Sequence, residues 1–316
     1  MTNLPAERPL SPKSGRVKKA RKLGRRSARA EQRLFLAEGA KTLTEALHAP
    51  GGVVEVFATE EASDQYAALR RAVDGAGVPW LHVSEDAITS LSGAVTPQGI
   101  VAACRFLAVD LDTLLDSAVV EQPAPALRRA GIADRPSSSE RPRAGSREEQ
   151  PAEASDQSRP GQPTVVICAD IRDPGNAGTV IRTADAAGAA GVVLSGSSVD
   201  LYNDKTVRAS VGSLWHLPIS VVDDPAECVR RARAAGFVIL AADGAGETAL
   251  FEAETSGLLD SPVAWLFGNE AWGLPDEVAV LADHRVSIPI FGRAESLNLS
   301  TAAAVCLYAS ARAGRT

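Results

Sequence analysis

Residues 165–178 read VVICADIRDPGNAG, an apolar run followed by a polar turn that leads into a helical pattern. Further apolar runs lie at residues 192–195, 218–222, 237–241, 263–267 and 286–290, with helical stretches between most of them. Near-continuous apolar strands that alternate with helices predict an α/β fold with a parallel sheet covered on both faces. Residues 299–313 form an alanine-rich, apolar helical stretch with no charge before Arg312. We expect this last helix to be buried in the core or in a subunit interface.

The N-terminal half repeats the alternation on a smaller scale. Predicted strands lie at residues 35–39, 53–58, 80–83 and 100–106, with a predicted helix at 65–73. They indicate a small α/β domain over residues 34–108. From about Pro123 to Pro163 the composition shifts to Pro, Ser, Arg, Glu and Gln, which cannot bury enough surface to offset the entropy of ordering. We therefore assign residues 109–163 to a disordered linker and residues 164–316 to a second domain, although a structureless loop within one domain is an alternative.

Charge is distributed unevenly along the chain. The net charge of the 316 residues is −6, yet residues 13–33 contain ten Lys or Arg side chains and one acid, Glu31. This basic N-terminal segment, residues 1–33, could follow the phosphates of a nucleic acid. A solvated basic helix or a disordered tail is the competing interpretation.

Several classes of protein are disfavoured by composition. No stretch approaches the roughly 20 apolar residues that a membrane-spanning helix needs, and the polar N-terminus lacks the apolar core of a secretory signal. We expect a soluble, cytoplasmic protein with no membrane partner. Four scattered cysteines and four unclustered histidines predict neither disulfides nor a metal site.

Three segments of the second domain follow predicted strands and are rich in Gly, Asn and charged side chains. They are residues 170–178, which lead into a helix carrying Arg182, residues 266–274 and residues 288–301. Ligands of parallel α/β sheets bind at the carboxyl ends of the strands. Taken singly, each segment has a structural explanation, such as a turn glycine, a helix cap at Asn298 or Ser296, or a surface ion pair of Arg182.

The order and spacing of these segments carry more information than any one of them. The series is N-x-G-x-x-x-R-T-A at residues 176–184, F-G-N-E-x-x-G-L at 267–274, and I-P-I with E-S-L-N-L-S-T-A at 288–302. It resembles, in order, the three signature motifs of the SpoU (TrmH-like) family of RNA 2′-O-ribose methyltransferases, of the SPOUT superfamily. The stretch Arg208 to Ser213 is also similar to its family counterpart. More weakly, the first domain, with its basic helix and the segment Thr96 to Ile100, resembles the small RNA-binding domain that many members carry.

The resemblance implies a fold, a cofactor and partners. The C-terminal segment would be tied into a trefoil knot, which the general rule on unthreaded connections would have excluded. S-adenosylmethionine would bind in the knotted pocket formed by the loops that carry Gly268, Ile288 and Leu297. The substrate would be RNA, with ribosomal RNA preferred over transfer RNA. The catalytic domain would form a homodimer.

The resemblance also implies roles for individual residues. Arg182 matches the arginine proposed to activate the ribose hydroxyl. Because arginine stays protonated, we expect it to bind phosphate and stabilise the developing alkoxide. The other polar motif positions would orient the cofactor, the ribose or Arg182; they are Asn176, Glu270, Ser296 and Asn298. The predicted cofactor-binding residues are Phe267, Gly268, Asn269, Ile288, Leu297 and Asn298.

Two other functions remain open from the residues alone. An ordinary Rossmann enzyme would need G-x-G-x-x-G after the first strand, where this chain has Asp170 to Asn176, and the later Gly244-Ala245-Gly246 lacks the third glycine. A catalytically inactive RNA-binding or ribosome-assembly protein of the same fold is the second alternative. Because every polar motif position is retained, the sequence favours the enzyme.

Overall fold

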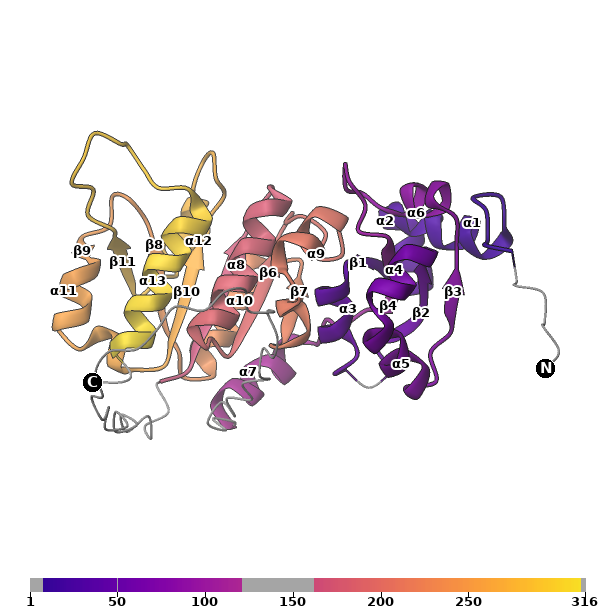
Figure 1. The fold of residues 1–316 in the computed structure, drawn as a ribbon. Coiled ribbons are helices and arrows are strands. Elements are labelled where there is room, and N and C mark those ends of the chain that lie inside the picture. The colour runs from indigo at the N-terminus through magenta and orange to yellow at the C-terminus, as the bar shows by residue number, and fades with distance from the viewer. Residues whose placement is uncertain (1–7, 50, 121–161, 314–316) are drawn as a thin grey trace, which may run out of the picture.

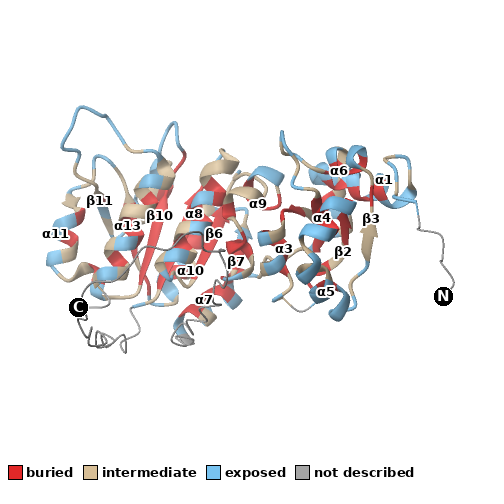
Figure 2. Cartoon of the chain, in the orientation of Figure 1, coloured by how far each residue is buried: buried red, intermediate tan, exposed pale blue. Residues whose placement is uncertain are grey.

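The computed structural model describes residues 8–49, 51–120 and 162–313. Two α/β domains lie side by side, with the N-terminal domain in indigo and purple and the C-terminal domain in pink to yellow (Figure 1). Most of the predicted disordered stretch, residues 121–161, lies outside the described residues. The two domains are built on separate sheets, and their buried strands form the red interior of each in Figure 2.

The N-terminal domain has a mixed sheet of four strands in the order β1-β4-β2-β3. The strands are β1 (Leu34–Glu38), β2 (Val53–Ala58), β3 (Trp80–His82) and β4 (Ile100–Arg105). One face packs against α3 (Ala40–Ala46), α4 (Glu60–Gln65) and α5 (Ala67–Gly75), and the other against α1 (Gly15–Arg21) and α6 (Glu85–Leu91). The helix predicted at residues 65–73 is present as α5 and begins two residues later, because the non-helical backbone of Tyr66 separates it from α4.

Within the basic segment, residues 15–32 are part of this domain rather than a tail. Helix α1, the short 3-10 helix η1 (Lys22–Gly24) and helix α2 (Arg26–Gln32) run across the sheet. Val17, Ala20 and Leu23 point inward and are buried, while most of the cations remain exposed. Apolar residues spaced three apart therefore attach this strongly charged segment to the domain.

The C-terminal domain has a parallel sheet of seven strands in the order β7-β6-β5-β10-β8-β11-β9. The strands are β5 (Thr164–Ala169), β6 (Gly191–Ser195), β7 (Ile219–Val222), β8 (Val238–Ala242), β9 (Thr248–Ala249), β10 (Val263–Phe267) and β11 (His284–Ser287). The fold class is thus the predicted one, a parallel-sheet α/β domain that follows a small α/β domain. The last strand, β11, is inserted between β8 and β9, which precede it in the chain, as the resemblance to a knotted family implies.

Helices cover both faces of the large sheet, as the apolar strands require. One face packs against α8 (Pro174–Ala187), α9 (Asp204–Ser210), α11 (Leu250–Thr255) and α13 (Leu299–Ala313). The other packs against α7 (Leu111–Val120), α10 (Pro225–Ala234) and α12 (Asp276–Ala279). The 3-10 helices η2 (Ser213–Trp215) and η3 (Leu258–Asp260) complete the domain.

Two sequence expectations need correction here. Residues 111–120, which we assigned to the linker, form α7, because Leu111, Leu114 and Leu115 are buried against strands β5 and β6. Their apolar spacing adds a helix to the second domain before the low-complexity stretch begins. The predicted strand at residues 286–290 ends at Ser287 instead. The following Pro289 has no N–H to continue a ladder, and the chain leaves the sheet there.

Aromatic packing joins the domains into one hydrophobic cluster. The Tyr202 ring stacks on Phe106 at 3.8 Å and lies 4.7 Å from Phe35, measured between ring centroids. Its hydroxyl accepts hydrogen bonds from the backbone N–H groups of Leu107 (2.7 Å) and Ala108 (2.8 Å). Tyr202 of the C-terminal domain therefore holds the segment that connects the two domains.

Candidate active site

The turn after β5 is held in an unusual backbone conformation. Asp170 has φ +58°, in the left-handed region, and its carboxylate accepts from the N–H of Ser197 at 2.7 Å. The Asn269 amide donates to the Asp170 carbonyl at 2.7 Å and accepts from the N–H of Ala271 at 2.8 Å. Asn269 is buried, and the hydrogen bonds of its side chain join the loop after β10 to the turn after β5.

Helix α8 begins directly after this turn. The Asp173 carboxylate caps the helix by accepting from the Asn176 N–H at 2.8 Å, and Pro174 occupies the first turn, where its missing N–H costs nothing. The hydrogen bond from Asn176, together with the nearby Lys205 ammonium, holds the pKa of Asp173 below its ordinary value despite partial desolvation. The cap fixes Asn176 and, six residues further on, Arg182.

A chain of three side chains links the three motifs. Asn176 donates through its amide to a Glu270 oxygen at 3.1 Å, and Asn298 donates to the Asn176 carbonyl oxygen at 3.1 Å. Glu270 also accepts from the backbone N–H groups of Arg172 and Asp173, both at 3.2 Å. Asn176 lies 94 residues from Glu270 and 122 residues from Asn298 in the sequence. The motifs that follow separate strands therefore meet in one place.

The protonation of Glu270 follows from this arrangement. Partial burial is the largest single effect and would raise the pKa of Glu270, but the hydrogen bonds from Asn176 and three backbone N–H groups outweigh it. The pKa therefore lies below the ordinary value of 4.5. At neutral pH the side chain is a carboxylate that accepts hydrogen bonds and donates none.

Beside this chain of side chains lies a cleft of about 470 Å³. Its lining comes from the carboxyl ends of β8, β10 and β11 and from the start of α13; the residues are Asn176, Ala242, Asp243, Gly244, Phe267, Gly268, Asn269, Glu270, Gly273, Val286, Ile288, Ile290, Glu295, Ser296, Leu297, Asn298, Leu299 and Ala302. The volume suits a small organic ligand, which typically occupies ~300–1,000 Å³. One wall is apolar, and the other offers amide, carboxylate and backbone groups.

Gly268 shows how closely the wall of the cleft is packed. A Cβ atom at this position would lie 2.3 Å from the carbonyl carbon of Gly273 and 2.4 Å from the nitrogen of Leu274. The short bridge between Asn269 and Gly273 brings the two backbone segments together. Only glycine fits, so the motif glycine is required by close packing of the loop.

The comparisons with known proteins identify both domains. Residues 163–308 match the SpoU rRNA Methylase family, and residues 15–102 match the MRM3-like substrate binding domain. The C-terminal domain belongs to the SpoU family.

Relatives of the SpoU family cover different shares of the chain. The 23S rRNA (guanosine(2553)-2′-O)-methyltransferase RlmP of Bacillus subtilis is 29% identical over 302 residues, which are 94% of this chain and 96% of that protein. The 23S rRNA (uridine(2479)-2′-O)-methyltransferase of Streptomyces viridochromogenes is 40% identical over 151 residues. These are 45% of this chain and 51% of the relative, so the chain spans about half the length of that protein.

Solved SpoU structures agree with both domains. The AdoMet-bound rRNA methyltransferase from Sinorhizobium meliloti is 29% identical, with a TM-score of 0.71 over 96% of this chain and 97% of that one. AviRb from Streptomyces viridochromogenes in complex with AdoMet is 28% identical, with a TM-score of 0.71 over 95% and 98% of the two chains. The cleft of this SpoU domain fits the same cofactor in size and in its combination of apolar and backbone walls.

The structure gathers most of the predicted site residues. All the predicted cofactor-binding positions line the cleft, as do Asn176, Glu270, Ser296 and Asn298. Of the two proposed caps for α13, Asn298 is the one formed, because its side-chain oxygen accepts from the Ser300 N–H at 3.0 Å. Arg182 does not line the cleft; it is exposed on α8 and forms no ion pair within the described residues.

Sequence reasoning missed one wall of the cleft. Ala242, Asp243 and Gly244 line it from the end of β8, and the Asp243 carboxylate binds the Nε of Arg285 at 3.0 Å. We had considered Gly244 only as part of an incomplete Rossmann motif. The available signal was its position directly after an apolar strand, at the edge where ligands of parallel sheets bind.

Within residues 8–49, 51–120 and 162–313, no group of three or more His, Cys, Asp or Glu side chains is arranged to hold a metal ion. No helix among these residues is long and apolar enough to cross a membrane.

Proposed function

We propose that this chain methylates a ribose 2′-hydroxyl of 23S ribosomal RNA. The substrate class is supported by the two relatives named above, which act on 23S rRNA, and by the matched substrate-binding domain. The single observation that favours an active enzyme is the hydrogen-bonded chain Glu270–Asn176–Asn298, which connects all three motifs beside the cleft. A protein that had lost the reaction would have no reason to maintain it.

In this proposal the cleft residues divide between two tasks. Ile288, Leu297 and the backbone of Phe267, Gly268 and Asn269 hold S-adenosylmethionine. When bound, the cofactor supplies an electrophilic methyl group. Glu270, Asn176 and Asn298 keep the loops in register, so that the methyl acceptor meets the donor in line. Ser296, exposed on the cleft, contacts cofactor or ribose.

Arg182 serves the RNA side of the reaction. Its side chain is exposed and unpaired among the described residues, so its guanidinium is available to a phosphate. A ribose hydroxyl is a weak nucleophile near neutral pH and develops negative charge as it attacks the methyl carbon. A fixed positive charge stabilises that developing alkoxide without itself losing a proton.

A homodimer through the catalytic domain is part of the proposal. Helix α13 packs Ala303, Cys306 and Leu307 into the core, yet its Tyr308 is 56% exposed. Exposed aromatic surface on an apolar helix is typical of an interface between subunits. Sedimentation equilibrium should give twice the chain mass, and Tyr308→Glu should give the monomer.

The proposal is tested by separating cofactor binding from transfer. Arg182→Ala should bind S-adenosylmethionine with the wild-type affinity in calorimetry, while tritium transfer to transcribed 23S rRNA falls by about 10²- to 10³-fold, as for loss of one charge-stabilising donor. Arg230→Ala, an exposed arginine on α10, is the matched control and should keep both. Equal loss of binding and transfer in Arg182→Ala would refute the assigned role.

A further inference from the structure

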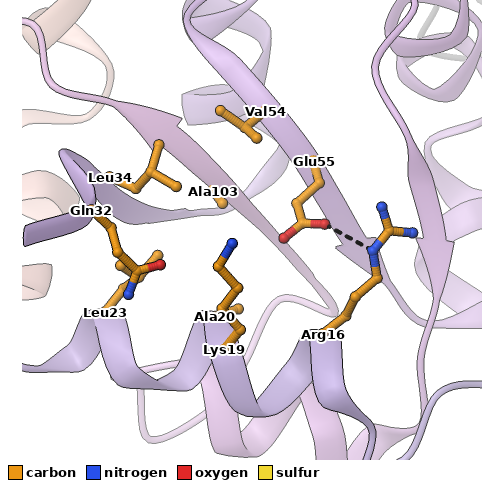
Figure 3. Close-up of a pocket in the computed structure, with 9 residues that line it drawn as sticks. All are labelled: Arg16, Lys19, Ala20, Leu23, Gln32, Leu34, Val54, Glu55 and Ala103. Carbon is orange, nitrogen blue, oxygen red and sulfur yellow. Dashed lines mark ion pairs between the residues drawn. The ribbon is translucent and has the colours of Figure 1, made fainter. Parts of the chain in front are cut away.

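A second hollow lies in the N-terminal domain, where the basic segment crosses the sheet. It has a volume of about 290 Å³ and is lined by residues of α1, η1, α2 and strands β1, β2 and β4 (Figure 3); these are Arg16, Lys19, Ala20, Leu23, Gln32, Leu34, Val54, Glu55 and Ala103. A shallower hollow shares Lys19, Gln32 and Leu34 with it and extends toward Lys22. Together they form a groove, which we call the α1–α2 groove. It shares no residue with the catalytic cleft.

The inside of the groove is apolar and its rim is charged. Ala20, Leu23, Leu34 and Ala103 supply small and branched aliphatic groups along the hollow shown in Figure 3. Lys19 is exposed beside them and forms no ion pair with any described residue. An apolar slot with unneutralised ammonium groups at its edge suits a flat ring that carries a phosphate.

Two polar side chains give the groove hydrogen-bonding capacity. The carboxamide oxygen of Gln32 is buried and has no hydrogen-bond partner within the described residues. Glu55 is only 17% exposed and pairs with the Nε of Arg16 at 3.4 Å. A buried acceptor without a donor is uncommon in proteins and calls for an explanation. The amino and imino groups of a nucleobase are donors of the required kind.

The groove is held in place relative to the reaction site. Arg29, in α2, donates to Asp200 of the catalytic domain through Nε (3.1 Å) and Nη2 (2.5 Å). The neighbouring Val199 N–H donates to the carbonyl of Ile171 at 2.8 Å, and Ile171 lies in the turn before Asn176. An RNA contact in the groove would therefore be at a fixed separation from the ribose that is methylated.

We propose that the α1–α2 groove binds one unpaired nucleotide of the RNA substrate, with its base in the apolar slot and its phosphate on Lys19. This inference rests on the proposed RNA substrate and adds a recognition point remote from the methylated ribose. A base in a duplex could not enter, because its edges and faces are occupied by its partner and neighbours. The groove thus selects RNA with a flipped or single-stranded nucleotide.

The test measures RNA binding without cofactor, so that it does not depend on catalysis. The probe is a fluorescein-labelled single-stranded RNA dodecamer of mixed sequence, with the same strand in a blunt duplex for comparison. Lys19→Gln should lower the slope of log affinity against log salt by about 1, the value for one phosphate contact. Lys18→Gln, an exposed neighbour on α1 that does not line the groove, is the matched control and should leave the slope unchanged.

A second variant tests entry of the base itself. Ala103→Leu adds volume inside the slot without changing charge and should weaken dodecamer binding about tenfold, the loss expected for one base contact, while duplex binding stays unchanged. Its melting temperature is measured first. If this variant does not fold, cross-linking of a 4-thiouridine dodecamer to the wild-type protein replaces it and should label the peptides that contain Lys19 and Leu34.

Several results would overturn the assignment of a nucleotide to the α1–α2 groove. Equal slopes for Lys19→Gln and Lys18→Gln would mean diffuse attraction to the basic segment and would overturn the proposal. So would a folded Ala103→Leu variant that binds like wild type, or cross-links confined to other peptides. A wild-type protein that binds through the groove yet methylates no 23S rRNA would contradict the proposed function and leave the groove intact.

Discussion

Replacing Gly268 with alanine should weaken cofactor binding much more than it weakens the fold. The added Cβ would lie 2.3 Å from the Gly273 carbonyl carbon, whereas real contacts of this kind do not fall below 3.0 Å. The loop must therefore open by at least about 0.7 Å. Overpacking of this kind costs about 1–3 kcal/mol. In the free protein the exposed loop relaxes, but binding must close it again, so the strain is expressed as a loss of affinity.

An overpacking cost of about 1–3 kcal/mol would raise the dissociation constant for S-adenosylmethionine about 5- to 150-fold. Isothermal titration calorimetry of the purified variant measures this directly, with the melting temperature as a check on folding. Gly292→Ala is the matched control, because a Cβ at Gly292 meets nothing within 4 Å. An unchanged affinity in Gly268→Ala would show that the 268–273 loop does not form the cofactor site.

Three further predictions concern the two domains and their titrating groups. Arg29→Ala removes a guanidinium that is only 7% exposed and leaves Asp200 without its partner, so it should lower the free energy of unfolding by about 3–5 kcal/mol in urea titrations. Arg16→Ala removes a cation that is 55% exposed to solvent and should cost less than about 1 kcal/mol. The pKa of Glu270 is lowered in the folded protein, so its contribution to stability is complete above the ordinary value of 4.5 and is lost as the pH falls through the folded pKa. Glu270→Gln should therefore reduce the loss of unfolding free energy with falling pH in this acid range. Burial raises the pKa of all four cysteines to about 12. A maleimide should therefore label none of them in the native protein and all of them in guanidinium. Labelling of the native protein at the rate of the unfolded protein would contradict the buried placement.

The parts of the fold that the sequence predicted are those fixed by local pattern. Strand β10 has the predicted bounds, Val263–Phe267, and so does helix α13, Leu299–Ala313. Strand β10 is a short apolar run between Pro262 and Gly268, and α13 is a longer apolar helix that begins after Asn298, so the ends of both are marked by local signals. The motif residues were found for a different reason, because their order matched a known family. That they lie together around Asn176 depends on the order of strands in the sheet, which no local pattern encodes.

Two features that the sequence did not predict, helix α7 and the pairing of Arg29, depend on contacts with residues that are distant in the sequence. Helix α7 was hidden in the linker because its apolar face is stabilised by strands that come more than 40 residues later. Arg29 was one cation among ten until the structure paired it with Asp200, 171 residues away. Pairs at such separation leave no spacing signal in a single sequence, whereas helix caps and strand periods do.

Methyl transfer to a ribose of 23S rRNA can be observed in cells. Total 23S rRNA would be isolated from a strain that lacks this protein and from the same strain carrying the wild-type or Arg182→Ala gene, and 2′-O-methylation would be mapped by resistance to alkaline hydrolysis. We expect one 2′-O-methylated nucleotide to be lost in the deletion strain, restored by the wild-type gene and not restored by Arg182→Ala. Identical 2′-O-methylation of 23S rRNA in all three strains would contradict this expectation.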